Sequence, residues 1–206
     1  MQDVFHETAR ALERGETCVL ATVIQTAGST PQKPGAKLLV REDGSGVGTL
    51  GGGCVEGDIW FAAKTLLRSG GSTEVREYEL TEEIAARDGL ICGGTMYFLL
   101  DPILKSGEFL GQVQRVEQAY KGGTPVGIAT LAVVPSDSQL NVGTKLFIQD
   151  DGQTQGSLGV EELNQEVLAR ARELIPNGKC DYLISKSGFE VFVETYTAPP
   201  TLVIMG

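Results

Sequence analysis

Apolar residues gather into short, nearly continuous runs that recur along the chain. The runs CVLATVIQT (18–26) and VGIATLAVV (126–134) are rich in β-branched residues and predict buried strands. Each is followed by a second strand, AKLLVRE (36–42) or TKLFIQD (144–150), and then by an Asp-Gly turn. Asp-Gly is a strong short-range hairpin signal, so both stretches predict a β-hairpin.

Apolar residues with helical spacing follow each hairpin. VEGDIWFAAKTLLRSG (55–70) and VEELNQEVLARARELIPNG (160–178) predict amphipathic helices, and both end at a glycine that suits a left-handed C-terminal cap. Two further helices are expected over about 2–15 and 107–121. The remaining predicted strands are TEVREYEL (73–80), TMYFLL (95–100), CDYLIS (180–185) and FEVFVET (189–195).

An internal repeat relates the two series of elements. Residues 18–70 align with residues 126–178 without a gap, and identical pairs fall on turn glycines such as Gly35 and Gly143. Strands, turns and helices stay in register, which indicates a duplication. We therefore predict an α/β fold: a mixed sheet with flanking helices, built from two duplicated βα units.

The repeat separates residues that the architecture needs from residues that only one copy has. Before the second strand, the first copy has AGSTPQKPG and the second has PSDSQLNVG. At the start of the helix, the first copy has GGGCVEGD and the second has GVEELNQE, so Glu162 stands where the first copy has Cys54. Both copies need the hairpin and the helix, so we look for function in what the first copy adds.

Composition and charge limit the class of partner. The 206 residues carry 17 basic and 27 acidic side chains, a net charge of −10, with no polybasic patch. This balance argues against nucleic acid and against an anionic membrane as partners. No apolar run approaches the roughly 20 residues of a membrane span, and the N-terminus lacks the apolar region of a signal peptide. We expect a cytoplasmic protein.

The cysteines and the histidine limit the chemistry. The four cysteines form no CxxC pair and no disulfide framework, as in a reducing cytoplasm. Cys18 and Cys180 each open an apolar strand and are predicted to be core residues. The only histidine, His6, lies on the first predicted helix, away from other reactive groups, and is interpreted as a surface residue. Neither histidine-based catalysis nor a metal site is expected.

The glycine run before Cys54 is the most unusual stretch of the first copy. A glycine loop at a helix N-terminus offers backbone N–H groups and the positive end of the helix dipole, which suits a phosphate or another anion. A thiol there is expected to have a lowered pKa. GTLGGGCVEGD (48–58) thus predicts an anion site, a nucleophile or soft ligand, or both. The architectural alternative is a tight turn with a small buried cysteine.

Other residues of the first copy add to this site. A second Cys-Gly-Gly element begins at Cys92, and its counterpart SKSGFEVFV has no cysteine. The loop GSTPQKPG (28–35) has two prolines, two hydroxyls and Lys33, which suits closing over an anion, although it is also an ordinary connection between strands. Glu56 lies in the first helical turn, where it favours the dipole and where a general-base role stays open. Lys37 matches Lys145, which indicates a structural role.

Together, GSTPQKPGAKLLV, DGSGVGTLGGGCVEGD and CGGTMYFLLDP resemble the XdhC/CoxI family, accessory proteins for maturation of xanthine dehydrogenase and carbon monoxide dehydrogenase type molybdoenzymes. The resemblance covers essentially the whole chain, including FEVFVETYTAPPTLVIMG. It implies a chaperone that binds molybdenum cofactor (molybdopterin) transiently and protects it while a cysteine desulfurase supplies the terminal sulfido ligand. Such a protein then aids insertion into a xanthine dehydrogenase-type apo-enzyme. The resemblance leaves homo-oligomerisation open.

Chemistry and spacing suggest how the cofactor is held. The glycine loop would cradle the pterin phosphate or its anionic edge, and Cys54 and Cys92 would lie near the molybdenum–sulfur end, where soft thiolates are suitable partners. We expect the two cysteines to approach one another across one cleft, with Lys33 at its rim. The predicted cofactor-binding residues are Gly28, Ser29, Thr30, Lys33, Gly51, Gly52, Gly53, Cys54, Glu56, Cys92, Gly93 and Gly94.

Two features depart from the family pattern. Family members commonly have arginine after the proline of GSxP, where this chain has Gln32, so one anion contact is missing or is made by Lys33. They also usually continue from PPxLVIxG into a Rossmann-type domain. We therefore predict an accessory domain over 1–198, and a linker with the first strand of a truncated Rossmann-type domain over 199–206.

Two alternatives belong to other functional classes. A sulfurtransferase would carry a persulfide on Cys54 or Cys92 and would have a thiol that alkylation detects. A nucleotide-binding module is suggested by the glycine loop. However, GTLGGGCVEG lacks the GxGxxG spacing of the dinucleotide-binding fingerprint.

Overall fold

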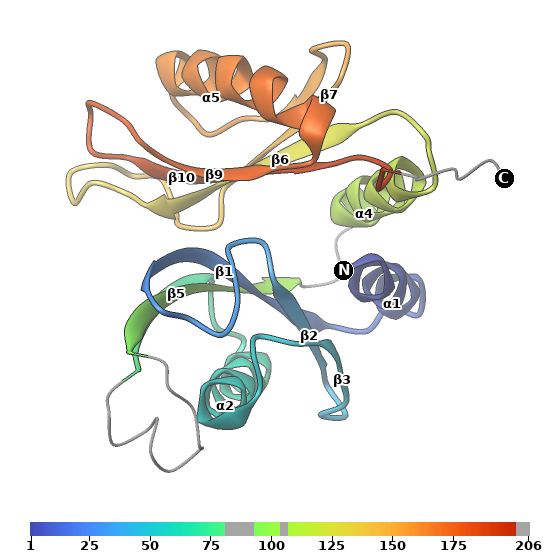
Figure 1. Cartoon of the computed structure of the whole chain (residues 1–206), viewed down its shortest axis with the longest axis vertical. Helices are drawn as coiled ribbons and strands as arrows, with labels where there is room; N and C mark the ends of the chain where they lie inside the picture. Colours follow the sequence, from blue (N-terminus) through green and yellow to red (C-terminus); the bar gives the residue numbers. More distant parts are fainter. Residues whose placement is uncertain (81–92, 104–106, 201–206) are drawn as a thin grey trace, which may run out of the picture.

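A computed structural model describes residues 1–80, 93–103 and 107–200, and Figure 1 shows the arrangement of its elements. The first half begins with a helix, continues through three strands to a second helix, and ends with two strands. These elements are α1 (Gln2–Glu13), β1 (Cys18–Gly28), β2 (Lys37–Arg41), β3 (Gly46–Gly48), α2 (Gly53–Ser69), β4 (Glu74–Glu79) and β5 (Gly94–Ile103).

The second half has the same succession of elements, with one short 3-10 turn added after its second helix. They are α4 (Gly107–Tyr120), β6 (Val126–Val133), β7 (Lys145–Gln149), β8 (Thr154–Gly156), α5 (Glu161–Leu174), η1 (Ile175–Asn177), β9 (Cys180–Ile184) and β10 (Glu190–Tyr196). Residues 18–70 and 126–178 therefore have the same order of strands and helices, as the repeat predicts.

Each half forms its own five-stranded sheet. The strand orders are β3-β2-β1-β5-β4 and β8-β7-β6-β10-β9, so equivalent strands occupy equivalent places. The α/β class and the two equivalent units agree with the sequence prediction, but one mixed sheet is replaced by two sheets whose described pairings are all antiparallel. The two halves do not share one sheet because β1 and β6 each already pair with a strand on both sides within their own half.

The two sheets stack face to face, with α2 and α5 on the two outer faces (Figure 1). Between the sheets, Ile24 and Leu99 of the first half pack with Ala132 and Phe192 of the second. Each outer helix covers its sheet with apolar residues at helical spacing. These are Val55, Ile59, Ala62, Ala63 and Leu66 in α2, and Leu163, Val167, Ala171 and Leu174 in α5.

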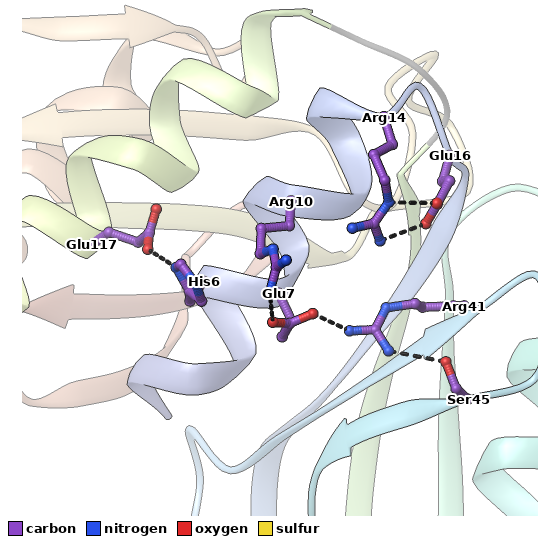
Figure 2. Close-up of polar contacts among 8 residues, drawn as sticks. All are labelled: His6, Glu7, Arg10, Arg14, Glu16, Arg41, Ser45 and Glu117. Carbon is purple, nitrogen blue, oxygen red and sulfur yellow. Dashed lines mark hydrogen bonds and ion pairs between the residues drawn. The ribbon is translucent and has the colours of Figure 1, made fainter.

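Helices α1 and α4 lie side by side at one end of the sheets and share a core cluster with both halves (Figure 1). Figure 2 shows the polar contacts around them. His6 Nδ1 of α1 lies 2.9 Å from Glu117 Oε1 of α4. Arg41 of β2 donates from Nη2 to the Glu7 carboxylate of α1 at 2.5 Å. The His6 side chain is 54% exposed, so its predicted surface position is confirmed.

Two ion pairs also join the halves, and each pairs a lysine of one half with a carboxylate of the other, one partner buried and one partly buried. Lys37 Nζ lies 2.6 Å from Glu194 Oε2, and Lys145 Nζ lies 2.7 Å from Asp101 Oδ2. The two lysines are matched in the repeat. The two carboxylates are equivalent as well, since one lies opposite Leu20 of β1 and the other opposite its counterpart in β6. Lys37 thus has the structural role that the repeat indicates.

Candidate functional site

The glycine turn at the start of α2 packs against the proline-rich loop between β1 and β2. Gly51 has a φ of 116°, which side chains rarely adopt, and a Cβ there would lie only 2.7 Å from Pro31 Cγ. A glycine at this position therefore allows both the turn and the close approach of the loop. Two segments of the predicted site are in contact here.

A third segment of the predicted site lies beside the same loop. Gly28 pairs with Gly94 where β1 meets β5. A Cβ on Gly94 would lie 2.5 Å from the carbonyl oxygen of Ala27, so the two backbones are as close as glycine permits. The loop that starts at Gly28 thus contacts the glycine turn on one side and the start of β5 on the other.

Both halves enter the outer helix through the same hydrogen-bonded turn. In the first half, Glu56 Oε2 accepts hydrogen bonds from the Thr49 hydroxyl at 2.7 Å and from the Leu50 N–H at 2.8 Å. In the second half, Asn164 Oδ1 accepts a hydrogen bond from the Leu158 N–H at 2.9 Å. Glu56 and Asn164 are matched in the repeat. This position therefore satisfies backbone donors near the helix N-terminus in both halves.

The halves differ at the residues that follow this turn. Gly52 and Gly53 have φ values of 74° and 66°. Val160, which is matched with Gly52, is extended, with φ −128° and ψ 121°. The turn and the helix can therefore form without positive φ at this position. Among the described residues, a Cβ on Gly52 would meet nothing within 4 Å, so the glycine leaves space beside the start of α2 in this part of the structure.

The Glu56 carboxylate is part of this turn. Although burial favours the protonated form, hydrogen bonds from Thr49 and from the N–H groups of Leu50 and Gly52 lower the pKa of Glu56 below its ordinary value of 4.5. A carboxylate with a lowered pKa is a weaker proton acceptor. These hydrogen bonds give Glu56 a structural role in the turn, and the general-base role that the sequence left open stays untested.

We expect Glu56→Ala to lower the free energy of unfolding by about 1 kcal/mol, the usual cost of losing a cap at a helix N-terminus. Because the pKa of Glu56 is lowered in the folded chain, its stabilising contribution is present above pH 4.5 and is lost as the pH falls through the folded-state pKa. Thermal unfolding between about pH 3 and 7 measures this for the native chain, Glu56→Ala and the matched Asn164→Ala. The deficit of Glu56→Ala should shrink on acidification. A deficit that stays constant, as expected for Asn164→Ala, would contradict the assignment.

The two cysteines of the predicted site are not equally placed. Cys54 lies in the first turn of α2, directly after the glycines, and is half-buried. Cys92 lies outside the described residues, so the expected approach of the two sulfur atoms stays a prediction. Its neighbour Gly93 is exposed, and a Cβ there would meet none of the described residues within 4 Å. Open space thus lies beside two of the predicted glycines.

The polar residues of the loop between β1 and β2 have different surroundings. The Thr30 hydroxyl donates to the Gln32 carbonyl at 3.0 Å, which holds the loop in its turn, and Ser29 is exposed. Lys33 is exposed and borders two grooves, one of about 310 Å³ shared with Thr49 and one of about 450 Å³ shared with the second half. Cys54 is not among the described residues that line either groove, so the expected position of Lys33 at the rim of a cleft shared by the two cysteines stays a prediction. One of its grooves extends to the other half of the molecule.

The remaining two cysteines differ from one another. Cys18 is fully buried, as predicted, and burial raises its pKa to about 12. Cys180 is not a core residue: it is half-buried, and its thiol donates to the carbonyl oxygen of Pro34 at 3.4 Å. The difference arises because Cys180 opens β9, an edge strand that faces a loop of the other half. The apolar pattern of one strand cannot show such a contact.

In the described ranges, no group of three or more histidine, cysteine, aspartate or glutamate side chains is placed to hold a metal ion. Over the same part of the chain, no helix is both long enough and apolar enough to cross a membrane. What the candidate site offers is glycine surface, the N-terminal end of α2 and the half-buried side chain of Cys54, at one end of the first sheet.

The sequence profile of the XdhC and CoxI family matches residues 11–79 and 119–184, one stretch in each half. The chain belongs to this family. The first stretch contains the proline-rich loop, the glycine turn and Cys54. The resemblance drawn from these motifs is therefore confirmed.

Two bacterial relatives match parts of the chain. It is similar to the molybdenum cofactor insertion chaperone PaoD of Escherichia coli (strain K12), with 33% identity over 118 residues, which are 57% of this chain and 35% of that protein. It is also similar to a probable xanthine dehydrogenase subunit of Bacillus subtilis (strain 168), with 46% identity over 57 residues, which are 27% of this chain and 17% of that protein. The matches thus span about a third or less of these relatives.

A solved structure shares the fold. The crystal structure of a xanthine dehydrogenase from Bacillus halodurans aligns with a TM-score of 0.64 and 24% sequence identity, over 94% of this chain and 53% of that chain. This likeness shows the arrangement of helices and strands. The expected Rossmann-type strand near the end of the chain falls on residues 201–206, outside the described residues, and stays an expectation.

Proposed function

We propose that this chain binds molybdenum cofactor as cargo and supports its insertion into a xanthine dehydrogenase-type apo-enzyme. Membership of the family and the name of the E. coli relative support this function. The observation that carries the position of the site is the open glycine start of α2, where Gly52 and Gly53 have positive φ and the second half has an extended valine. A backbone conformation that the fold does not require suits a place where a ligand approaches the chain closely.

The residues at this helix start fit two parts of such a cargo. The first N–H groups of α2 and the positive end of its dipole suit the phosphate of the pterin. The space beside Gly52 and Gly93 lets a ligand reach the backbone without meeting a side chain of the described residues. Cys54 adds a soft sulfur atom, which suits the molybdenum–sulfur end. Protection of that end during sulfuration by a cysteine desulfurase, and transfer to the apo-enzyme, belong to the same proposal.

Direct binding is the first test. The purified chain is incubated with molybdenum cofactor and separated by gel filtration, and molybdenum and pterin are both measured in the protein fraction. The two should co-elute with the protein in a constant ratio. A chain that retains neither, while its circular dichroism spectrum shows folded protein, would overturn the proposal.

We expect Cys54→Ser to reduce molybdenum retention by about tenfold or more, as is usual when a metal site loses a supporting group. Serine replaces a soft sulfur with a hard oxygen, a poorer partner for a molybdenum–sulfur centre. The free energy of unfolding should change by no more than about 0.5 kcal/mol, because the second half forms the equivalent turn without a thiol.

The matched control for this variant is Glu162→Ser, which changes the equivalent position of the second half. It should leave molybdenum retention unchanged. If Cys54→Ser and Glu162→Ser retain the cofactor equally well, the thiol has no part in binding. If Cys54→Ser loses stability and retention in proportion, its role is structural.

A further inference from the structure

A groove of about 450 Å³ lies at the seam between the two halves. One wall is the loop between β1 and β2, with Lys33 and Pro34, and the other is the start of β9, with Lys179, Cys180 and Tyr182. Its volume falls in the range of small-molecule sites, roughly 300–1,000 Å³. Residues from opposite ends of the chain therefore form one concave surface.

The charges around this groove favour an anion. Lys33 and Lys179 are both exposed, and neither has a carboxylate within ion-pair distance among the described residues. The acidic residue of the groove, Asp181, is paired with Arg170, whose Nε lies 2.6 Å from Oδ2. In a chain with a net charge of −10, two lysines from different halves thus create a local positive charge.

The molecule contains a second seam between the halves, which the repeat relates to the first. At each seam, the residues where a strand of one half begins lie against a turn glycine of the other half. A Cβ on Gly35 would lie 3.7 Å from Cys180 Sγ, and a Cβ on Gly143 would lie 2.5 Å from Thr73 Oγ1. Gly35 and Gly143 are matched in the repeat. Cys180 and Thr73 therefore occupy equivalent positions in the two seams.

The equivalent seam has no lysine at the corresponding positions. Lys179 precedes Cys180, whereas Ser72 precedes Thr73. Lys33 is matched in the repeat by Asn141. Since the fold accommodates serine and asparagine at one seam, it does not require two lysines at the other. Their presence beside a groove therefore points to a ligand.

We propose that this groove is a second binding site, for a small organic anion made of a flat heteroaromatic ring and a phosphate group. Lys33 and Lys179 contact the phosphate from opposite walls. Pro34 and Tyr182 offer apolar surface to the ring, and the tyrosine is fixed because its hydroxyl donates to Glu190 at 2.7 Å. The site is separate from the glycine start of α2 and goes beyond the proposed function.

Titration of the full chain with four probes tests this inference. Guanosine monophosphate and neopterin monophosphate carry a phosphate on a purine or a pterin, while guanosine and inorganic phosphate each lack one part. Calorimetry should show saturable binding of at least one phosphorylated ring, and the compound that binds identifies the ring as a purine or a pterin. Both guanosine and inorganic phosphate should bind more weakly. If neither phosphorylated ring shows saturable binding, the proposal is overturned.

Two variants locate the binding in the groove. Lys179→Ser and Lys33→Asn introduce the residues of the equivalent seam, so the fold should tolerate them. Each should weaken binding of the phosphorylated ring by about fivefold, the upper range for one exposed charge contact, with a smaller effect at high salt. Lys121→Ser, which removes an exposed lysine elsewhere, is the control and should bind like the native chain. Equal binding by the native chain and both groove variants would overturn the proposal.

The outcome is independent of the proposed function. Cys54→Ser leaves the groove intact and should bind the phosphorylated ring as the native chain does. Lys179→Ser leaves the glycine start of α2 intact. Molybdenum retention lost in Cys54→Ser but kept in Lys179→Ser, together with ring binding lost only in Lys179→Ser, would show two sites. Loss of ring binding in Cys54→Ser would place the ring at α2, and loss of molybdenum retention in Lys179→Ser would merge the two sites; either would overturn the second site.

Discussion

Replacing Lys37 with methionine is expected to lower the free energy of unfolding by about 3–5 kcal/mol, the range for removing one partner of a buried ion pair. The Lys37 side chain is fully buried, and its Nζ lies 2.6 Å from Glu194 Oε2 and 2.9 Å from the Thr22 hydroxyl. Methionine fills a similar volume but leaves the Glu194 carboxylate, which is 13% exposed, without its cation. Chemical denaturation of the native chain and the variant measures the loss.

The equivalent pair of the repeat supplies the comparison. Lys145 is 20% exposed, and its partner Asp101 keeps a hydrogen bond from the Thr73 hydroxyl at 2.8 Å. Water can therefore replace part of the lost interaction, and Lys145→Met should cost less than Lys37→Met. Lys33→Met, on the surface, should change stability by no more than about 0.5 kcal/mol.

A double variant separates a lost ion pair from poor packing. Lys37→Met combined with Glu194→Leu removes both charges, so it should recover much of the stability that Lys37→Met loses. If the double variant is as unstable as Lys37→Met, or if Lys37→Met is as stable as Lys33→Met, the two halves do not depend on this pair.

The hairpins and helices could be predicted from the sequence because local chemistry determines them. At the Asp-Gly turn of the first half, Asp43 accepts a hydrogen bond from the Ser45 N–H at 2.8 Å. At the turn of the second half, Asp151 accepts one from the Gln153 N–H at 2.9 Å. Such contacts span two residues, so a short stretch of sequence contains both partners. Because of the repeat, each of these elements also occurs in a second copy, so its sequence pattern can be checked twice.

Contacts between the halves could not be predicted in the same way. Nothing near Lys37 indicates Glu194 as its partner, and nothing near Cys180 indicates Pro34, because each pair joins segments far apart in the chain. The same limit explains why two stacked sheets were not distinguished from one mixed sheet. Apolar patterns show that a strand is buried on both faces, but the covering element can be a helix or a second sheet.

The candidate site was predicted in part. Comparing the repeats identified the glycines before Cys54, but only backbone dihedrals show that Gly52 departs from the extended Val160. Glu56 and Asn164 are chemically different, so the sequence suggested a role for the carboxylate alone. Their shared hydrogen bonds show that both hold the same turn.

Gly94→Ala is expected to lower the free energy of unfolding by about 1–3 kcal/mol, the usual cost of inserting an atom into a packed region. A Cβ there would lie 2.5 Å from the Ala27 carbonyl oxygen and 2.7 Å from that of Ser29. These are backbone atoms, which cannot rotate aside as a side chain does. Because Gly94 pairs with Gly28, the displacement falls on the loop that places Pro31 against the glycine turn.

Gly93→Ala is the matched control, one residue away. A Cβ on Gly93 would meet none of the described residues within 4 Å, so the free energy of unfolding of Gly93→Ala should stay within about 0.5 kcal/mol of the native value. Under the proposed function, the exposed Gly93 borders the cargo, and Gly93→Ala should reduce molybdenum retention without destabilising the chain. Gly94→Ala should lose both stability and molybdenum retention. Equal stability of the two variants would contradict the close packing of β5 on the loop, and native retention by Gly93→Ala would exclude that glycine from the binding surface.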